Sequence, residues 1–98
     1  MSVLGTYSAA ADTPIGRREM EISIYESNGA YSGILRSENG VIEIPEVKVD
    51  GDSFTFSTDL QLPMGSIFAT FNCNIVGDML VGEVVTPYAT VDLRGERA

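Results

Sequence analysis

The amino-acid sequence predicts an all-β fold, an eight-stranded antiparallel up-and-down barrel that forms a single domain over residues 1–98. Three observations predict it. Apolar and polar residues alternate along most of the chain, no window shows the 3.6-residue period of a helix, and turn-forming stretches recur at short intervals. Short strands joined by tight turns most simply form a meander, and closing the meander into a barrel removes both unpaired edges.

The turns separate the expected strands. Seven stretches rich in Gly, Pro, Asn and Asp indicate turns: TPIG at 13–16, SNG at 27–29, SENG at 37–40, VDGD at 49–52, LPMG at 62–65, VGD at 76–78 and TPYA at 86–89. The expected strands are therefore 5–13, 17–26, 30–36, 41–49, 53–61, 66–75, 79–85 and 89–97. The alternating apolar side chains of each strand are expected to point into the barrel.

An internal two-fold pseudo-repeat with an offset of 49 residues is also predicted. The Pro-x-Gly turns at Pro14 and Pro63 are related by this offset. Identities at the offset are few, but expected inward residues coincide: Tyr7/Phe56, Ile22/Phe71, Ile24/Cys73, Tyr31/Leu80, Leu35/Val84, Ile42/Val91 and Ile44/Leu93. The pattern predicts two four-stranded halves. A meander with evenly spaced strands and no repeat explains the same spacing, and this alternative stays open.

Short motifs at the two ends resemble those of lipocalins and related avidin-like (calycin) barrels. GTY at 5–7 is similar to the Gly-x-Trp signature of their first strand, with Tyr7 where tryptophan is usual, and RGERA at 94–98 is similar to their last strand. Together with YSG at 31–33 and LVG at 80–82, these motifs resemble a group of small bacterial lipocalin-like domains. The resemblance implies a barrel whose closed end places Arg97 over the Tyr7 ring in a cation–π contact, and it implies no particular activity.

Composition limits the partners and the chemistry. Six basic and 14 acidic residues give a net charge of −8, which disfavours binding to nucleic acid and to anionic membranes. No apolar run reaches the roughly 18–20 residues of a membrane helix, and the start lacks a signal-peptide pattern, so we expect a soluble cytoplasmic protein. With no histidine and one cysteine, Cys73, the chain cannot form the usual catalytic triads, an internal disulfide or a cysteine-rich zinc site. No metal and no cofactor are expected.

The predicted barrel contains a candidate ligand site in its interior. Entry is expected at the end with the proline turns, past a rim made of Thr13, Arg17, Arg18, Glu38, Asn39, Met64, Ser66 and Tyr88. The candidate ligand-binding residues are mostly apolar with a few polar groups: Arg18, Met20, Ile22, Tyr31, Leu35, Thr58, Leu60, Phe71 and Tyr88. A filled core has the same composition, so a cavity and a solid core both remain open.

The polar candidates each have an ordinary structural explanation beside the functional one. Arg18 offers a bidentate partner for a carboxylate or phosphate, but a rim arginine commonly pairs with a neighbouring glutamate. Tyr31 and Asp12 offer weak acid–base groups, but a strand tyrosine usually packs and an aspartate before Thr-Pro usually stabilises the turn. Cys73, with no histidine to activate it, is expected to be a small buried apolar residue.

Three functions are compatible with these features. The leading hypothesis is a small-molecule binding barrel for an apolar or weakly acidic ligand. The alternatives are a small barrel enzyme (an isomerase, cyclase or lyase) that uses Tyr31, Arg18 or Asp12, and a structural or oligomerisation module. Outward apolar residues on neighbouring strands, Phe68, Val81 and Val85, also predict a homodimer through that wall.

Overall fold

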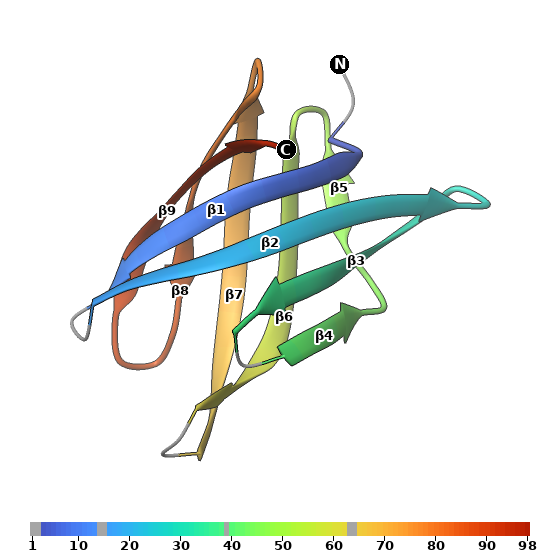
Figure 1. Ribbon diagram of the computed structural model, residues 1–98. Coiled ribbons are helices and arrows are strands. Elements are labelled where there is room, and N and C mark those ends of the chain that lie inside the picture. The colour runs from blue at the N-terminus through green and yellow to red at the C-terminus, as the bar shows by residue number, and fades with distance from the viewer. Residues whose placement is uncertain (1–2, 14–15, 39, 63–64) are drawn as a thin grey trace.

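The computed structural model describes residues 3–13, 16–38, 40–62 and 65–98. These residues form nine strands: β1 Gly5–Thr13, β2 Gly16–Ser27, β3 Ala30–Ser37, β4 Gly40–Ile44, β5 Lys48–Asp50, β6 Ser53–Leu62, β7 Gly65–Val76, β8 Met79–Val85 and β9 Thr90–Arg97. They make one antiparallel sheet in the order β4-β3-β2-β1-β9-β8-β7-β6-β5 (Figure 1). The predicted all-β, antiparallel, up-and-down fold is confirmed. Over these four ranges, no helix is long and apolar enough to cross a membrane.

The expected strand 41–49 is instead two strands, so the prediction of eight strands is wrong. β4 ends at Ile44 and pairs with β3, whereas β5, which follows Val47, pairs with β6. The amide of Val47 donates to the carbonyl of Tyr31 at 3.0 Å, one residue beyond the register of the β3–β4 ladder. The strand therefore carries an extra residue next to Pro45, which has no N–H to donate, and irregular edge positions of this kind tolerate proline.

The sheet curves over on itself without being closed by hydrogen bonds. Within the described ranges, β4 pairs only with β3, and β6 beyond Thr55 pairs only with β7. The Cα atoms of β4 and β6 approach within 8 Å but form no ladder. Figure 1 shows β1 and β2 crossing in front of β6 and β7. The two ends of the sheet are thus joined through the chain at 45–47 rather than through a ladder.

The hydrophobic core lies between the two halves of the curved sheet. The ring centroids of Tyr7 on β1 and Phe54 on β6 are 6.1 Å apart, although β9, β8 and β7 separate these strands in the sheet. Phe56 stacks on Phe54 at 6.2 Å and on Phe71 at 4.7 Å. Burial of one large apolar side chain contributes about 1.5–3 kcal/mol to the stability of the fold. This row of aromatic rings therefore stabilises the packing of β1 against β6 and β7.

Two glycines, Gly82 and Gly95, allow neighbouring strands to approach closely. A Cβ atom at Gly82 on β8 would collide with the backbone oxygen of Asn72, and one at Gly95 on β9 would collide with the backbone oxygen of Ser8. Only glycine fits such positions, because any side chain would push the strands apart. The close approach of β8 to β7 and of β9 to β1 therefore depends on there being no side chain at these two points.

The end of the core next to the termini is closed by Tyr7 and Arg97. Tyr7 is fully buried, and its hydroxyl donates to the carbonyl of Val3 at 2.6 Å. The guanidinium carbon of Arg97 lies 5.0 Å from the Tyr7 ring centroid, and its Nη1 donates to the carbonyl of Leu4 at 2.8 Å. Burial raises the pKa of Tyr7, and the nearby Arg97 partly offsets that shift. The predicted cation–π contact is confirmed.

Candidate functional site

The core is covered unevenly along β6. Phe54 and Phe56 are buried, whereas Thr58 and Leu60, further along the same face, are half-buried. The change follows the end of the β5 ladder, in which the last covered residue of β6 is Thr55. Past this point β6 still pairs with β7, but on its other side no strand pairs with it among the described residues. The hydrophobic interior is consequently open at this edge of the sheet.

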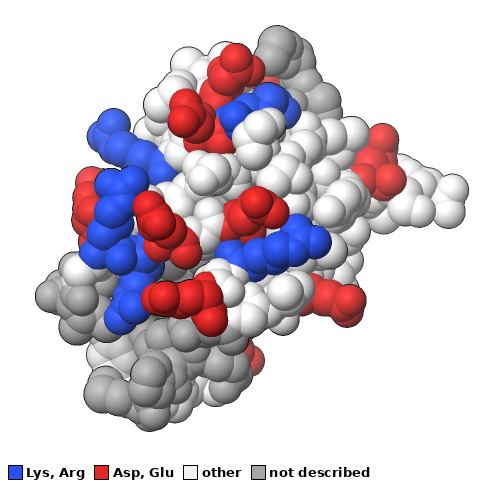
Figure 2. Space-filling model, viewed as in Figure 1, with Lys and Arg blue, Asp and Glu red and all other residues white. Residues whose placement is uncertain are grey.

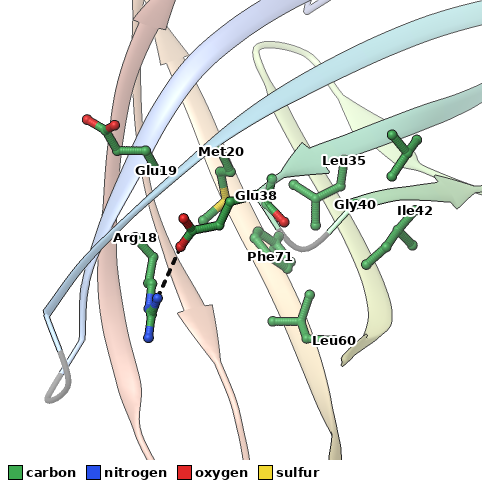
Figure 3. A pocket seen from close by; sticks show the side chains of 11 residues that line it. Arg18, Glu19, Met20, Leu35, Glu38, Gly40, Ile42, Leu60 and Phe71 are labelled. Carbon is green, nitrogen blue, oxygen red and sulfur yellow. Dashed lines mark hydrogen bonds and ion pairs between the residues drawn. The ribbon is translucent and has the colours of Figure 1, made fainter. Parts of the chain in front are cut away.

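A pocket of about 190 Å³ lies at the open edge. It is bounded by β2, β3, β4, β6 and β7, and its lining consists of Arg18, Glu19, Met20, Leu35, Ser37, Glu38, Gly40, Val41, Ile42, Leu60 and Phe71. Figure 3 shows the apolar side chains gathered on one side and the Arg18–Glu38 pair beside them. An apolar interior with a few polar groups is the usual make-up of a small-molecule site.

Two ion pairs border the pocket. Arg18 Nη1 lies 3.2 Å from Glu38 Oε1, and Arg17 Nε lies 3.7 Å from Glu19 Oε1. The Glu38 side chain is 75% exposed and that of Arg18 is 46% exposed. Ion pairs this accessible contribute about 0–1 kcal/mol, so Arg18 can exchange Glu38 for the anionic group of a ligand at little cost.

Five of the nine residues predicted to bind ligand line this pocket: Arg18, Met20, Leu35, Leu60 and Phe71. The other four lie elsewhere. Ile22 is buried in the core, and Thr58 is half-buried on β6 without lining the pocket. Tyr31 pairs with Glu26 at the opposite end of β3, and Tyr88 is 86% exposed in the 86–89 turn. Arg18, which was also expected at the rim, lines the pocket with a partly exposed side chain.

The predicted rim is found only in part. Glu38 lines the pocket, and Ser66 is exposed on β7 away from it. Asn39 and Met64 lie outside the described residues, as does the side chain of Thr13.

The sequence reasoning missed the contribution of β4 to the site. Ile42 was expected to face inward, but it was not assigned to a ligand site. The β3–β4 ladder places Ile42 opposite Leu35, and β4 ends after Ile44. The sequence carries a signal of that break. Ile42 and Ile44 are at even-numbered positions, whereas Val47 and Val49 are at odd-numbered positions. In a single regular strand these two pairs of side chains would point to opposite faces of the sheet, so they cannot all face the core. Pro45 lies where this pattern changes.

The remaining polar candidates do not form a reactive group with this pocket. Cys73 is buried, and burial raises the pKa of its thiol to about 12, so the thiol stays neutral and non-nucleophilic near neutral pH. Asp12 is exposed and lies opposite Arg17 in the β1–β2 ladder. Across the part of the chain that the structure describes, no three His, Cys, Asp or Glu residues gather into a group suited to a metal ion.

The strand register places one of the three outward apolar residues expected to form a wall away from the other two. Val85 lies opposite Thr70 and is therefore diagonal to Phe68, whereas Val81 lies opposite Asn74, further along β7. Glu83 stands between Val81 and Val85 on the outer face of β8. The three residues therefore do not make a continuous patch, and the homodimer stays a prediction.

Comparisons with protein-family models, with curated proteins and with solved structures gave no match for this chain. The likeness to lipocalin-like domains remains a prediction from short motifs. The functional assignment rests on the pocket and its surroundings.

Proposed function

We propose that the protein binds a small apolar or weakly acidic ligand in the pocket at the open edge of the sheet. The incomplete cover of the core at this edge carries the proposal. Met20, Ile42 and Leu60 pack against the core but remain half-buried around the pocket. Each square ångström of apolar surface that a ligand removes from water contributes about 25 cal/mol.

The volume of the pocket limits the ligand to a small group. About 190 Å³ is below the roughly 300–1,000 Å³ of sites for drug-sized molecules, and it equals the share of about six liquid water molecules. A branched aliphatic group or a single aromatic ring suits this space, whereas a long lipid chain does not.

Arg18 supplies the preference for a weak acid. Its guanidinium is at the rim, close to the apolar lining, and its partner Glu38 is mostly exposed. A ligand carboxylate would take the place of Glu38 and form a charge-assisted pair with Arg18 while the apolar body occupies the pocket.

The proposal includes the finer fold, a lipocalin-like barrel opened along one seam and built from two repeats. Strand bounds support the repeat, because β2 (16–27) and β7 (65–76) are related by the 49-residue offset. Gly33 and Gly82 are related by the same offset, and a Cβ at either would meet a backbone oxygen of the adjacent strand. The chain at 45–47, which links β4 to β5 across the seam, supports the barrel. A cytoplasmic location is also proposed, because a lone buried cysteine suits a reducing compartment.

Titration with 3-methylbutanoate and phenylacetate, followed by methyl NMR, tests the proposal. The methyl signals of Met20, Leu35 and Leu60 should shift, with smaller effects from the corresponding alcohols and amines. Leu60→Trp, which fills the pocket, should weaken binding at least tenfold. Val91→Trp is the control, since Val91 is half-buried on β9 and does not line the pocket. If no probe shifts these methyls, or if Leu60→Trp binds as well as the parent, the proposal is wrong.

Two neighbouring arginines allow a controlled test of whether Arg18 makes the protein prefer acids to alcohols. Arg18→Gln should reduce the preference for the acids over the alcohols, whereas Arg17→Gln should leave it unchanged, because Arg17 does not line the pocket. Equal effects of the two variants would contradict a direct role for Arg18.

A further inference from the structure

β6 has a long free edge. It pairs with β7 from Ser53 to Leu62, but on its other side β5 covers only Ser53–Thr55. No residue in the described ranges pairs with that side of 56–62. Seven residues of strand at about 3.3 Å each give an edge of roughly 23 Å, along which alternate residues present N–H and C=O groups that have no ladder partner. Such an edge is a template for an added strand.

The free edge borders the pocket. Leu60 belongs to this edge and lines the pocket, and Ile42 on β4 lies across from it. Directly opposed residues of neighbouring strands place their side chains on the same face of a sheet. A residue that pairs beside Leu60 on an added strand therefore directs its side chain into the pocket, and about 190 Å³ holds one large apolar side chain.

The space for an added strand is bounded by β4. At their closest, β4 and β6 lie within 8 Å, less than the roughly 9.6 Å that two strand spacings require. An added strand would move β4 outward. β4 is five residues long and is held by β3 alone among its described neighbours, so little ladder opposes that movement.

The charges around the edge are mostly acidic. Five of the six basic residues and six of the 14 acidic ones lie on β9, β1, β2 and β3, which leaves eight carboxylates and Lys48 on the rest of the chain. Figure 2 shows Lys and Arg side chains among acidic ones on the face formed by β1 and β2. Glu43 on β4 and Asp59 on β6 lie on the two strands that flank the opening. Together with Glu19 and Glu38 in the pocket lining, these carboxylates outnumber Arg18. A chain that adds beside Glu43 and Asp59 therefore meets an excess of negative charge, which favours basic residues outside the pocket.

We propose that the natural occupant of the pocket is the apolar side chain of an extended, basic peptide segment whose main chain adds to the β6 edge at 56–62. This inference rests on the proposed function, because it uses the same pocket. It adds main-chain pairing and a preference for positive charge.

The test uses a seven-residue peptide with a central leucine flanked by alternating lysine and threonine, acetylated and amidated. It should bind in NMR titrations and slow hydrogen exchange at least tenfold at those amides of 56–62 that point away from β7. Two further peptides carry N-methyl groups on odd or on even amides. Only one of these two should lose binding at least tenfold, because alternate amides of an added strand face β6. Replacing the central leucine with glutamate should also abolish binding.

The charge preference is tested with one matched pair of variants. Asp59→Lys should weaken binding of the lysine peptide at least threefold, and Glu83→Lys, the same change of sign on the outer face of β8, should not. If both N-methylated peptides bind like the parent, or if exchange at 56–62 does not slow, the inference is wrong. A further outcome is that amide hydrogen exchange at 56–62 slows as the protein concentration rises, with no peptide present. That result would show that a second copy of the chain occupies the edge, and it would also overturn the inference.

The outcome is separable from that of the proposed function. If 3-methylbutanoate shifts the Met20 and Leu60 methyls while the peptide does not bind, the small-ligand site stands and only the peptide inference fails. If neither binds, both fail.

Discussion

Arg97 joins several parts of the chain at a single side chain. It lies over the Tyr7 ring, donates to the carbonyl of Leu4, and its Nε is 3.6 Å from a carboxylate oxygen of Asp78. Tyr7 and Arg97 also oppose each other in the β1–β9 ladder. Contacts of this kind at a largely covered guanidinium are expected to matter more than those of an exposed arginine.

Arg97→Ala should lower the free energy of unfolding by about 1–2 kcal/mol, through loss of the cation–π contact and of the hydrogen bond to Leu4. Combined with Tyr7→Leu, it should cost less than the sum of the two single changes, because contacting residues are not additive. Urea denaturation of the four proteins measures the cycle. Arg94→Ala, an exposed arginine on the same strand, is the control and should change stability by less than about 0.5 kcal/mol. Strict additivity would show that the ring contact contributes nothing.

Cys73 should make the protein less stable in alkali. Burial raises its pKa from 9.0 to about 12, so between these values the unfolded chain loses a proton that the folded chain keeps. Stability is therefore complete below about pH 9 and falls as pH rises towards 12, at up to about 1.4 kcal/mol per pH unit. Cys73→Ala should remove this part of the slope in urea melts between pH 8 and pH 11. A smaller decline should remain above pH 10, since burial also raises the pKa of Tyr7. An unchanged slope in Cys73→Ala would contradict the assignment.

Among the glycines, Gly82 on β8 leaves the least room for a Cβ atom. Gly82→Ala should destabilise the fold by about 1–3 kcal/mol, because the new methyl group meets the backbone of β7 and cannot be accommodated by a rotamer change. Thermal unfolding measures the effect. Glu83→Ala, the next residue on the exposed face, serves as the control. Equal stability of Gly82→Ala and the parent would mean that the strands can separate there at no cost.

The regular strands were predictable because alternation and turn residues specify them locally. β2 and β7 were expected at 17–26 and 66–75 and are found at Gly16–Ser27 and Gly65–Val76. The tight hairpin turn between β2 and β3 was also predicted, and Asn28 and Gly29 have φ values of 53° and 82°, as a two-residue hairpin turn requires. The break at Pro45 was missed because strand pairing at an edge depends on partners far along the chain. The sequence does carry a local signal of the break, because the apolar residues change from even-numbered to odd-numbered positions before Val47. The expected strand 41–49 ran through that change.

The candidate site was less predictable than the strands. Alternation correctly indicated that Met20, Leu35 and Leu60 share one face. Alternation gave no information about where that face is left exposed at the edge of the sheet. The exposed part begins where the β5–β6 ladder ends, at Thr55. For the same reason Tyr31, on the same face of β3 as Leu35, was included although it lies far from the opening.

The predicted homodimer concerns the molecule as a whole. A net charge of −8 makes copies repel, so association requires an apolar contact large enough to overcome that repulsion. Phe68 and Val81 are both exposed, yet the register places them apart. Phe68→Glu and Val81→Glu therefore test separate surfaces, and only the one within the interface should dissociate a dimer in sedimentation at micromolar concentration. A parent protein that sediments as a monomer there would contradict the homodimer.

The link between β4 and β5 has a consequence for how the chain could be rewired. Read as a circle, the sequence visits the strands in the order in which they lie in the sheet, and the amide of Ala98 donates to the carbonyl of Thr6 at 2.9 Å. A circular permutant that joins the old termini through a short glycine linker and begins at Lys48 keeps every ladder. It breaks only the peptide bond between Val47 and Lys48, so the amide of Val47 can still donate to the carbonyl of Tyr31. The β1–β9 pairing, which spans most of the chain, becomes local, and a lower contact order favours faster folding.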